Sequence, residues 1–302
     1  MSANVAHSIH QRLLNKSRET GQPFGEVLQH FALERFLYRL SQSPYRDRFV
    51  LKGALLLRVW HRTESRFTRD IDLLGHTAND LEGIAAIIRD VCRQEVTADG
   101  LTFDPATVMP SRITEDAIYE GVRVIVRAHL GSARLRLQVD VGFGDVVVPA
   151  PTELWYPTLI DLPPALLLAY SRESSIAEKL TAMLALATAN SRLKDYYDIW
   201  LLSQHGDFEG AVLSEAIRQA CTLRGIKVLD EPIGLRPEFA LTEGKTTQWR
   251  GFVRKSHAAD APADLSEAVA AVREFLSPVL AALSAGRPFT MVWRAPGPWQ
   301  LA

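Results

Sequence analysis

Apolar and polar positions recur with two different periods along the first half of the chain. Helical spacing of apolar residues predicts a helix over 24–40 and a second one over 79–95, which Asn79 can cap. The apolar stretch 49–60 predicts a strand end or turn that leads into a short helix. Residues 67–74 alternate between apolar and polar side chains, which predicts a short strand. We therefore expect this half to mix strands and helices.

The clearest strand signal is a pair of alternating runs, 121–130 and 133–141, separated by Gly131 and Ser132. Two such runs joined by a short turn that contains glycine predict a β-hairpin. Because successive side chains of a strand point to opposite faces, the leucines and valines of the second run share one face. The other face carries polar side chains, namely Arg134, Arg136, Gln138 and Asp140.

Five prolines between residues 149 and 164 interrupt these patterns and indicate a lobe boundary. Beyond them the apolar spacing is mostly helical. It predicts helices over 175–189, 193–204, 213–224 and 265–283, and a late strand over 289–293. We therefore predict an α/β (α+β) bilobed fold, with a mixed sheet and flanking helices in residues 1–150 and a mostly helical lobe in residues 151–302.

The composition is that of an ordinary globular protein, with 47% hydrophobic and 23% charged residues among 302. A formal net charge of −1 means that any nucleic-acid partner has to be held by local basic patches. The two cysteines, Cys92 and Cys221, lie in no Cys/His cluster, so a zinc site is not expected. Without an apolar signal segment or an apolar run near 20 residues, we expect a cytoplasmic protein that spans no membrane.

The first chemical candidate is the carboxylate pair Asp70 and Asp72 on the predicted strand 67–74. Residues i and i+2 of a strand project from the same face, so the two carboxylates repel each other unless a cation lies between them. Mg²⁺ takes oxygen ligands and also binds substrate phosphates, which makes it the favoured cation. The apolar flanking residues place the pair at a buried strand edge, whereas a solvated acidic turn is the alternative.

Two further candidates accompany this pair. Asp140, on the polar face of the hairpin, can supply a third carboxylate to a metal, or it can form a salt bridge with a hairpin arginine such as Arg123. Lys52 and Gly53 lie just before the pair in the sequence. A glycine lets backbone N–H groups approach a phosphate, and a lysine adds a point charge. A glycine turn beside a lysine is also common without any ligand.

The helical lobe carries the remaining candidates. Lys179 lies at the edge of an apolar helix stripe, where its side chain either extends along the apolar surface to reach water or reaches into a cleft to meet phosphate; spacing alone favours the first alternative. Asp195 and Asp198 are separated by three residues and so share a helix face. Asp195 is also favourable near a helix N-terminus through the helix dipole. The segment 192–198, which includes Lys194, combines basic, acidic and tyrosine side chains and could bind a base and a triphosphate, although spacing does not show this.

Basic residues concentrate on both sides of the carboxylate pair. Between positions 46 and 69 there are seven lysines and arginines against two acids, and the hairpin adds four arginines. A polyanionic substrate would be held there by contacts that salt weakens. The alternative is a set of ordinary solvated arginines. The residues concerned are Arg46, Arg48, Lys52, Arg58, Arg62, Arg66 and Arg69 in the first zone and Arg123, Arg127, Arg134 and Arg136 in the hairpin.

Together these motifs resemble the AbiEii/AbiGii (MenT-like) toxin family of the polymerase-β-like nucleotidyltransferase superfamily. The matching segments occur in the family's order, at 51–54, 68–73, 139–145, 178–183 and 192–199. The resemblance implies a nucleotidyltransferase core lobe in residues 1–150, a helical lobe that contributes to the active-site cleft in residues 151–302, and Mg²⁺ with an NTP donor. It also implies a toxin with a cognate antitoxin that adds nucleotides to the 3′ end of tRNA and so blocks aminoacylation.

The resemblance also assigns site residues. The metal-binding carboxylates correspond to Asp70 and Asp72, with Asp140 as the expected third ligand. The family's essential lysine corresponds to Lys179, and its following aspartate to Asp195 or Asp198. We favour Asp195 because it directly follows the segment 192–194. The residues expected to bind the nucleotide are Lys52, Gly53, Arg69, Lys194 and Asp198.

Two other functions share parts of this pattern. The same active site could modify a protein hydroxyl, as in AMPylation, or a small-molecule hydroxyl; the paired basic zones favour RNA. A module that only binds a partner, with structural carboxylates, would gain no stability from Mg²⁺ and NTP.

Overall fold

The structure is a computed structural model that describes residues 2–61, 66–113, 121–258 and 260–301. It divides into two compact units, each of which we describe by itself. The first unit comprises Met1–Val59, Thr68–Gly144 and Thr152–Ala169, and the second comprises Trp60–Phe67, Asp145–Pro151 and Tyr170–Ala302.

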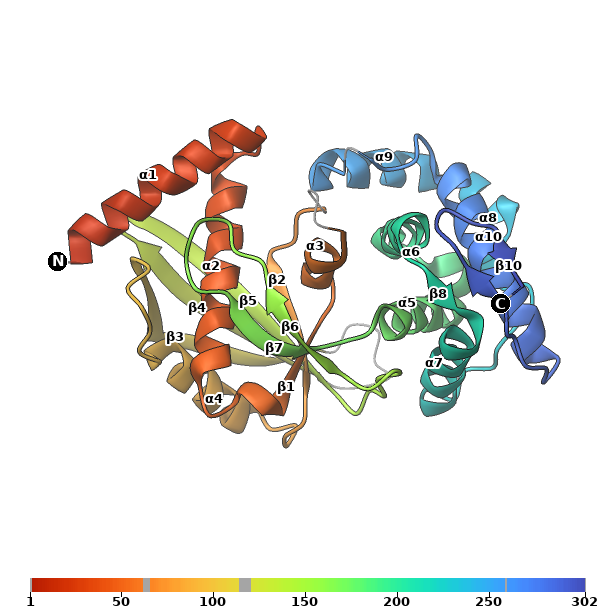
Figure 1. Cartoon of the computed structure of the whole chain (residues 1–302), viewed down its shortest axis with the longest axis horizontal. Helices are drawn as coiled ribbons and strands as arrows, with labels where there is room; N and C mark the ends of the chain where they lie inside the picture. Colours follow the sequence, from red (N-terminus) through yellow and green to blue (C-terminus); the bar gives the residue numbers. More distant parts are fainter. Residues whose placement is uncertain (1, 62–65, 114–120, 259, 302) are drawn as a thin grey trace. The chain divides into compact units, whose positions relative to one another are not determined.

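The first unit is built on a seven-stranded sheet with the order β3-β4-β5-β2-β1-β7-β6 (Figure 1). Two neighbouring pairs, β2 with β5 and β1 with β7, are parallel, and the other pairs are antiparallel, which confirms the predicted mixed sheet. The strands are β1 (Phe49–Lys52), β2 (Asp70–Gly75), β3 (Leu101–Ile113), β4 (Gly121–Leu130), β5 (Ala133–Phe143), β6 (Thr152–Tyr156) and β7 (Ala165–Ala169).

One face of this sheet is covered by helices. The helix α2 (Phe24–Gln42) packs on β7 and β5, and α4 (Leu81–Arg93) packs on β3 and β4; the two helices also contact each other. The covered face consists of apolar residues that include Ile71, Val124 and Val139, all with 0% exposure. On β4 and β5 the alternate residues form the opposite face, which is mostly polar and half-exposed or exposed. An antiparallel sheet region commonly has one packed face and one solvated face.

The other helices of the first unit are α1 (Ser2–Thr20) and α3 (Leu55–His61), and the second unit begins within α3. The helix α1 was not predicted, since its apolar stripe contains only Ala6, Ile9 and Leu13. The predicted cap of α4 was wrong. Asp80, rather than Asn79, accepts a hydrogen bond from the Gly83 backbone N–H at 2.7 Å. Its carboxylate binds one of the N–H groups that have no partner within the helix.

The second unit is mostly helical, as predicted, and its core is aromatic. Phe275 and Trp299 stack with ring centroids 5.6 Å apart, and Trp293 packs edge-on against Phe275. The helices are α5 (Arg172–Leu186), α6 (Leu193–His205), α7 (Gly210–Leu223), α8 (Pro237–Leu241), α9 (Lys245–Ser256) and α10 (Leu265–Ser284). The strands are β8 (Phe208–Glu209), β9 (Val292–Trp293) and β10 (Trp299–Gln300).

The proline-rich segment differs from expectation. We predicted only a lobe boundary there, but the segment contains β6 and β7, and Thr152–Ala169 belongs to the first unit. The prolines precede β6 or lie in the β6–β7 connection, where their missing N–H groups cost no ladder hydrogen bond. A division of the chain near residue 150 stays a prediction.

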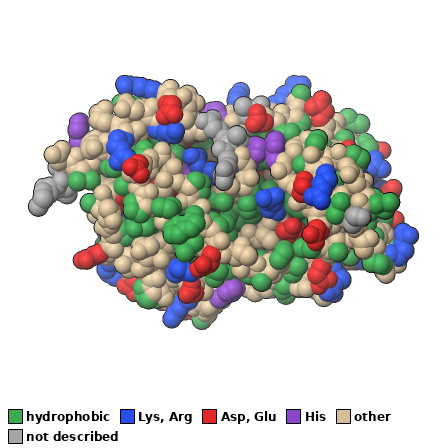
Figure 2. Space-filling model, viewed as in Figure 1, with side chains coloured by type: hydrophobic (Ala, Val, Ile, Leu, Met, Phe, Trp, Pro, Cys, Tyr) green, Lys and Arg blue, Asp and Glu red, His purple; other side chains and the backbone are tan. Residues whose placement is uncertain are grey.

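Surface charge and helix length agree with the bulk composition. Figure 2 shows basic and acidic side chains interspersed on the face that it draws, as expected for a net charge of −1. Within the residues that the structure describes, each helix is too short or too polar to cross a membrane.

Candidate active site

The carboxylate pair lies on the polar face of the first unit's sheet. Asp70 and Asp72 alternate along β2 with Ile71 and Leu73, which are 0% and 1% exposed, so both acids point away from the packed core. The predicted strand is confirmed, and the two acids lie within its first three residues, before a buried stretch. Because β2 pairs with β5 on one side and β1 on the other, the acids lie on a central strand.

Gly53 supports Asp72 directly. Its φ of +74° lies in the left-handed region, which favours glycine, and a Cβ built at this position would overlap the Asp72 carboxylate. The Asp72 carboxylate therefore rests against the Gly53 backbone. Lys52, the preceding residue, lies opposite Asp72 in the β1–β2 register. The phosphate contact predicted for this glycine stays a prediction, and the structure shows that the glycine makes room for the acid.

Asp140 lies opposite Asp72 in the parallel β2–β5 register, as a third ligand would require. Its two carboxylate oxygens, however, accept hydrogen bonds from the Arg123 guanidinium, each at 2.9 Å, and one also accepts from the Gln138 amide at 3.0 Å. The alternative that the sequence left open, a salt bridge to Arg123, is therefore present. Asp140 as a metal ligand stays a prediction.

The donor set at Asp70 and Asp72 fits Mg²⁺. Among the described residues, no group of three or more His, Cys, Asp and Glu side chains is arranged to hold a metal. Mg²⁺ does not require such a cage, because it is commonly bound by one or two carboxylates and takes its other ligands from water and substrate phosphates. Two carboxylates on one strand face, against a glycine backbone, provide this arrangement.

The second unit contains a separate cluster of buried charges around Asp198. This residue is 0% exposed, and its carboxylate accepts two hydrogen bonds from Arg66, at 2.6 and 2.8 Å. The Nζ of Lys179 lies 2.8 Å from Asp198 Oδ2. Such bidentate, charge-assisted contacts hold both partners in one geometry. Sequence analysis placed Arg66 only in a basic zone, and nothing in its local pattern indicated a partner 132 residues away.

The pKa shifts follow from these contacts. Burial raises the pKa of Asp198, but the Arg66 and Lys179 cations hold it well below its usual range. Burial lowers the pKa of Lys179, but Asp198 and Asp195 outweigh this effect, and the net pKa is raised. A raised pKa keeps the Lys179 amine protonated at neutral pH. The prediction that it extends to water was wrong, since only 14% of its side chain is exposed.

Asp195 lies in the first turn of α6 and is also 0% exposed. Its Oδ2 accepts a hydrogen bond from Arg192 at 2.9 Å. Its Oδ1 has no hydrogen-bond partner among the described atoms and lies 3.6 Å from Lys179 Nζ. Both acids predicted as the partner of Lys179 thus lie within 4 Å of it, and Asp198 is the closer one.

The other predicted residues are dispersed. Arg69 and Lys194 are exposed, so their predicted role in nucleotide binding stays a prediction. Asp145, the last residue of the matching segment 139–145, accepts hydrogen bonds from Tyr170 and Arg224. In the first basic zone, Arg46 pairs with Glu153 on β6, whereas Arg62 lies outside the described residues.

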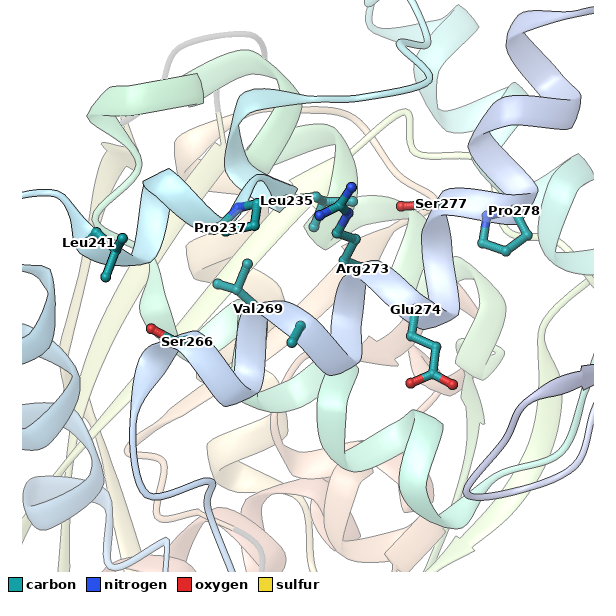
Figure 3. Close-up of a pocket in the computed structure, with 10 residues that line it drawn as sticks. Leu235, Pro237, Leu241, Ser266, Val269, Arg273, Glu274, Ser277 and Pro278 are labelled. Atoms are coloured by element: carbon teal, nitrogen blue, oxygen red, sulfur yellow. The ribbon is translucent and has the colours of Figure 1, made fainter.

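The second unit also contains a hollow with a volume of about 720 Å³ between α8 and α10 (Figure 3). None of the predicted site residues lines it. Its walls include Leu235, Pro237, Leu241, Val269, Arg273 and Pro278.

Comparison with known proteins gives one family. The model described as "Nucleotidyl transferase AbiEii toxin, Type IV TA system" matches residues 35–275. No curated protein matches the chain. Among solved structures, the chain is similar to JHP933 from Helicobacter pylori, with 14% identity, a TM-score of 0.48, and coverage of 86% of this chain and 92% of that one. It is also similar to a putative nucleotidyltransferase from H. pylori, with 16% identity, a TM-score of 0.43, and coverage of 86% and 95%.

Proposed function

The chain belongs to the AbiEii family of nucleotidyltransferase toxins of type IV toxin–antitoxin systems, and on that premise we propose that it transfers a nucleotidyl group from an NTP to the 3′ end of a tRNA. The observation that carries the proposal is the pair Asp70 and Asp72 on one open sheet face, with Asp72 against Gly53. A tRNA extended in this way is no longer a substrate for aminoacylation, so translation stops.

The proposed reaction is an in-line displacement. The 3′-hydroxyl oxygen of the acceptor forms a bond to the α-phosphorus of the NTP, the bond from that phosphorus to the bridging oxygen breaks, and pyrophosphate leaves with its electron pair. The hydroxyl proton passes to solvent. Asp70 and Asp72 would hold Mg²⁺, which supplies charge neutralisation at the phosphates when bound. Lys52, opposite Asp72, adds a positive point charge on the same sheet face.

For the second unit we propose a role in binding phosphate. Lys179 is a protonated amine with 14% of its side chain exposed, held by two carboxylates and without freedom to change rotamer. A cation fixed in this way stabilises negative charge without reorganising during the reaction. The ion pairs of this cluster join Arg66 and Lys179 to Asp198, and Arg192 to Asp195.

The acceptor is proposed as RNA because the sheet face that carries the acids also carries exposed arginines on β4 and β5. A protein or small-molecule acceptor would not need such a surface. The two classes give different labelled products, so one assay distinguishes them.

The test uses the whole chain with Mg²⁺, each α-labelled NTP in turn, and total tRNA. We expect label in RNA with at least one NTP, and loss of that label with Asp72→Asn. The matched control is Glu95→Gln, which makes the same charge change at an exposed position after α4. Thermal melting of both variants checks that they fold. Absence of labelled RNA with every NTP, or equal labelling by Asp72→Asn, overturns the proposal, and a labelled protein band identifies the other acceptor class.

A further inference from the structure

The polar face of the first unit's sheet is organised in rows across the strands. Asp72 on β2, Asp140 on β5 and Arg123 on β4 lie opposite one another in register. The next row contains Asp70 and Gln138. Residues that are opposite in register share a face, so these side chains form one continuous surface with the carboxylate pair.

Along β4 and β5 this surface changes from acidic to basic. Arg136, two residues before Gln138 on β5, lies opposite Arg127. Arg134, two residues before Arg136, lies opposite His129. The three arginines are exposed. At about 3.4 Å of rise per residue, Arg136 is about 14 Å and Arg134 about 20 Å from the position of Asp140 along β5.

These three arginines are available for a ligand. In the part of the chain that the structure describes, their guanidinium groups make no hydrogen bond or ion pair, in contrast to Arg123, whose guanidinium binds Asp140. One acid, Asp104, lies opposite Arg127 on β3, but its Oδ1 accepts a hydrogen bond from the Ala106 backbone N–H. Arg127 and Arg136 are therefore like charges opposite each other, which destabilises a sheet. An anionic ligand would remove that repulsion.

A row with apolar side chains lies between the row of Asp72 and Asp140 and the rows of the three arginines. Ile125 on β4 lies opposite Gln138, and Met109 on β3 lies opposite Ile125 with 63% of its surface exposed. This row is the one that contains Asp70. An exposed apolar side chain beside an amide suits the face and edge of an unpaired base better than a phosphate. The surface thus offers base contact near the acids and phosphate contact farther away.

We propose that this face of β4 and β5 binds the RNA acceptor, with the phosphates of its last stacked nucleotides on Arg127, Arg134 and Arg136 and its 3′ end directed toward Asp70 and Asp72. The direction of the bound RNA in this proposal rests on the proposed function, in which the reacting hydroxyl is at the 3′ end of the RNA. The arginines lie about 14–20 Å along β5 from Asp140, so the phosphates that they would contact lie several nucleotides before the 3′ end.

The experiment measures RNA affinity against salt concentration, with Asp72→Asn as the common background so that no reaction occurs. The probe is a labelled RNA hairpin with a single-stranded 3′ end. The test variant carries Arg127→Ser, Arg134→Ser and Arg136→Ser. The control variant makes the same charge change at exposed arginines of the second unit, Arg236→Ser, Arg273→Ser and Arg287→Ser.

Each phosphate contact contributes about 0.7 to 0.9 to the slope of log affinity against log salt. The test variant is expected to reduce this slope by about two to three, and the control variant to leave it unchanged. Equal effects of both variants, or no effect of the test variant on the slope, overturn the proposal. Failure of the proposed function is recognised separately, because wild-type protein would then label no RNA whatever the salt dependence of binding.

Discussion

Replacement of Gly53 by alanine tests the link between the backbone and the Asp72 carboxylate. Two costs are expected. The residue has a φ of +74°, and a left-handed conformation costs a residue with a Cβ about 1–2 kcal/mol. In addition, the new Cβ would overlap the Asp72 carboxylate, so that carboxylate has to move. A displacement of about 1 Å at a reacting group can reduce the rate by about 10²-fold.

Gly144→Ala is the matched control. Gly144 has a φ of +79°, and a Cβ there would meet no atom within 4 Å, so the control includes the backbone cost without the contact. Unfolding by urea should show a loss of about 1–2 kcal/mol for Gly144→Ala and a larger loss for Gly53→Ala. Nucleotidyl transfer should fall by about 10²-fold for Gly53→Ala alone.

A double-mutant cycle isolates the contact. In an Asp72→Ala background the carboxylate contacts are absent and only the Asp72 Cβ remains near position 53, so Gly53→Ala should cost less free energy of unfolding than it does with Asp72 present. If Gly53→Ala and Gly144→Ala are equal in both stability and activity with Asp72 present, the proposed support of the carboxylate by Gly53 is refuted.

Four further predictions concern charge and ligand binding. Asp198→Ala leaves Arg66 and Lys179 buried without their shared anion and should destabilise the fold by about 3–5 kcal/mol in urea; a loss under about 1 kcal/mol contradicts a structural role for the cluster. Because the pKa of Asp198 is lowered in the folded state, its stabilisation is present above the unfolded value of 3.8 and is lost as pH falls below it, so Asp198→Asn should flatten the acid limb of the stability–pH curve. Glu34 is buried in α2, where it accepts a hydrogen bond from the Leu159 backbone N–H. Burial raises the pKa of Glu34 from 4.5 to about 7, so the stability of the fold should fall as pH rises between those values. Glu34→Gln should abolish that slope, and an unchanged slope contradicts the assignment. Mg²⁺ with NTP at 100 times its dissociation constant should stabilise the wild type by about 2.7 kcal/mol in a thermal-shift assay but not Asp72→Asn, and equal shifts contradict the site.

Elements with a strong local pattern were predicted from the sequence. The hairpin of β4 and β5, with its turn at Gly131 and Ser132, lies where the alternation placed it. The helices α2, α6 and α10 begin or end within about two residues of their predicted bounds. Elements with a weak or interrupted pattern were missed: α1 has a short apolar stripe, β3 contains two prolines, and prolines surround β6 and β7.

In the candidate site, too, the features that follow from local backbone geometry were predicted, and those that depend on distant segments were not. The alternation along residues 67–74 was enough to predict that Asp70 and Asp72 share a face, because a strand's two faces are a property of the local backbone. It was not enough to predict that β2 is central, since the order of strands in a sheet depends on pairing between distant segments. For the same reason the sequence left Asp140 with two alternatives, and the β4–β5 register placed Arg123 opposite it.

By itself, the sequence determined which side chains share a strand or helix face, because that periodicity follows from backbone geometry within a few residues. Tertiary structure decided which of these faces meet. It placed the Gly53 backbone against Asp72 and brought Arg66 to Asp198, and it turned Lys179, which spacing alone directed to water, into a buried cation. Burial makes these pairings strong, since charges removed from water require a partner, and that partner can lie at any distance along the chain.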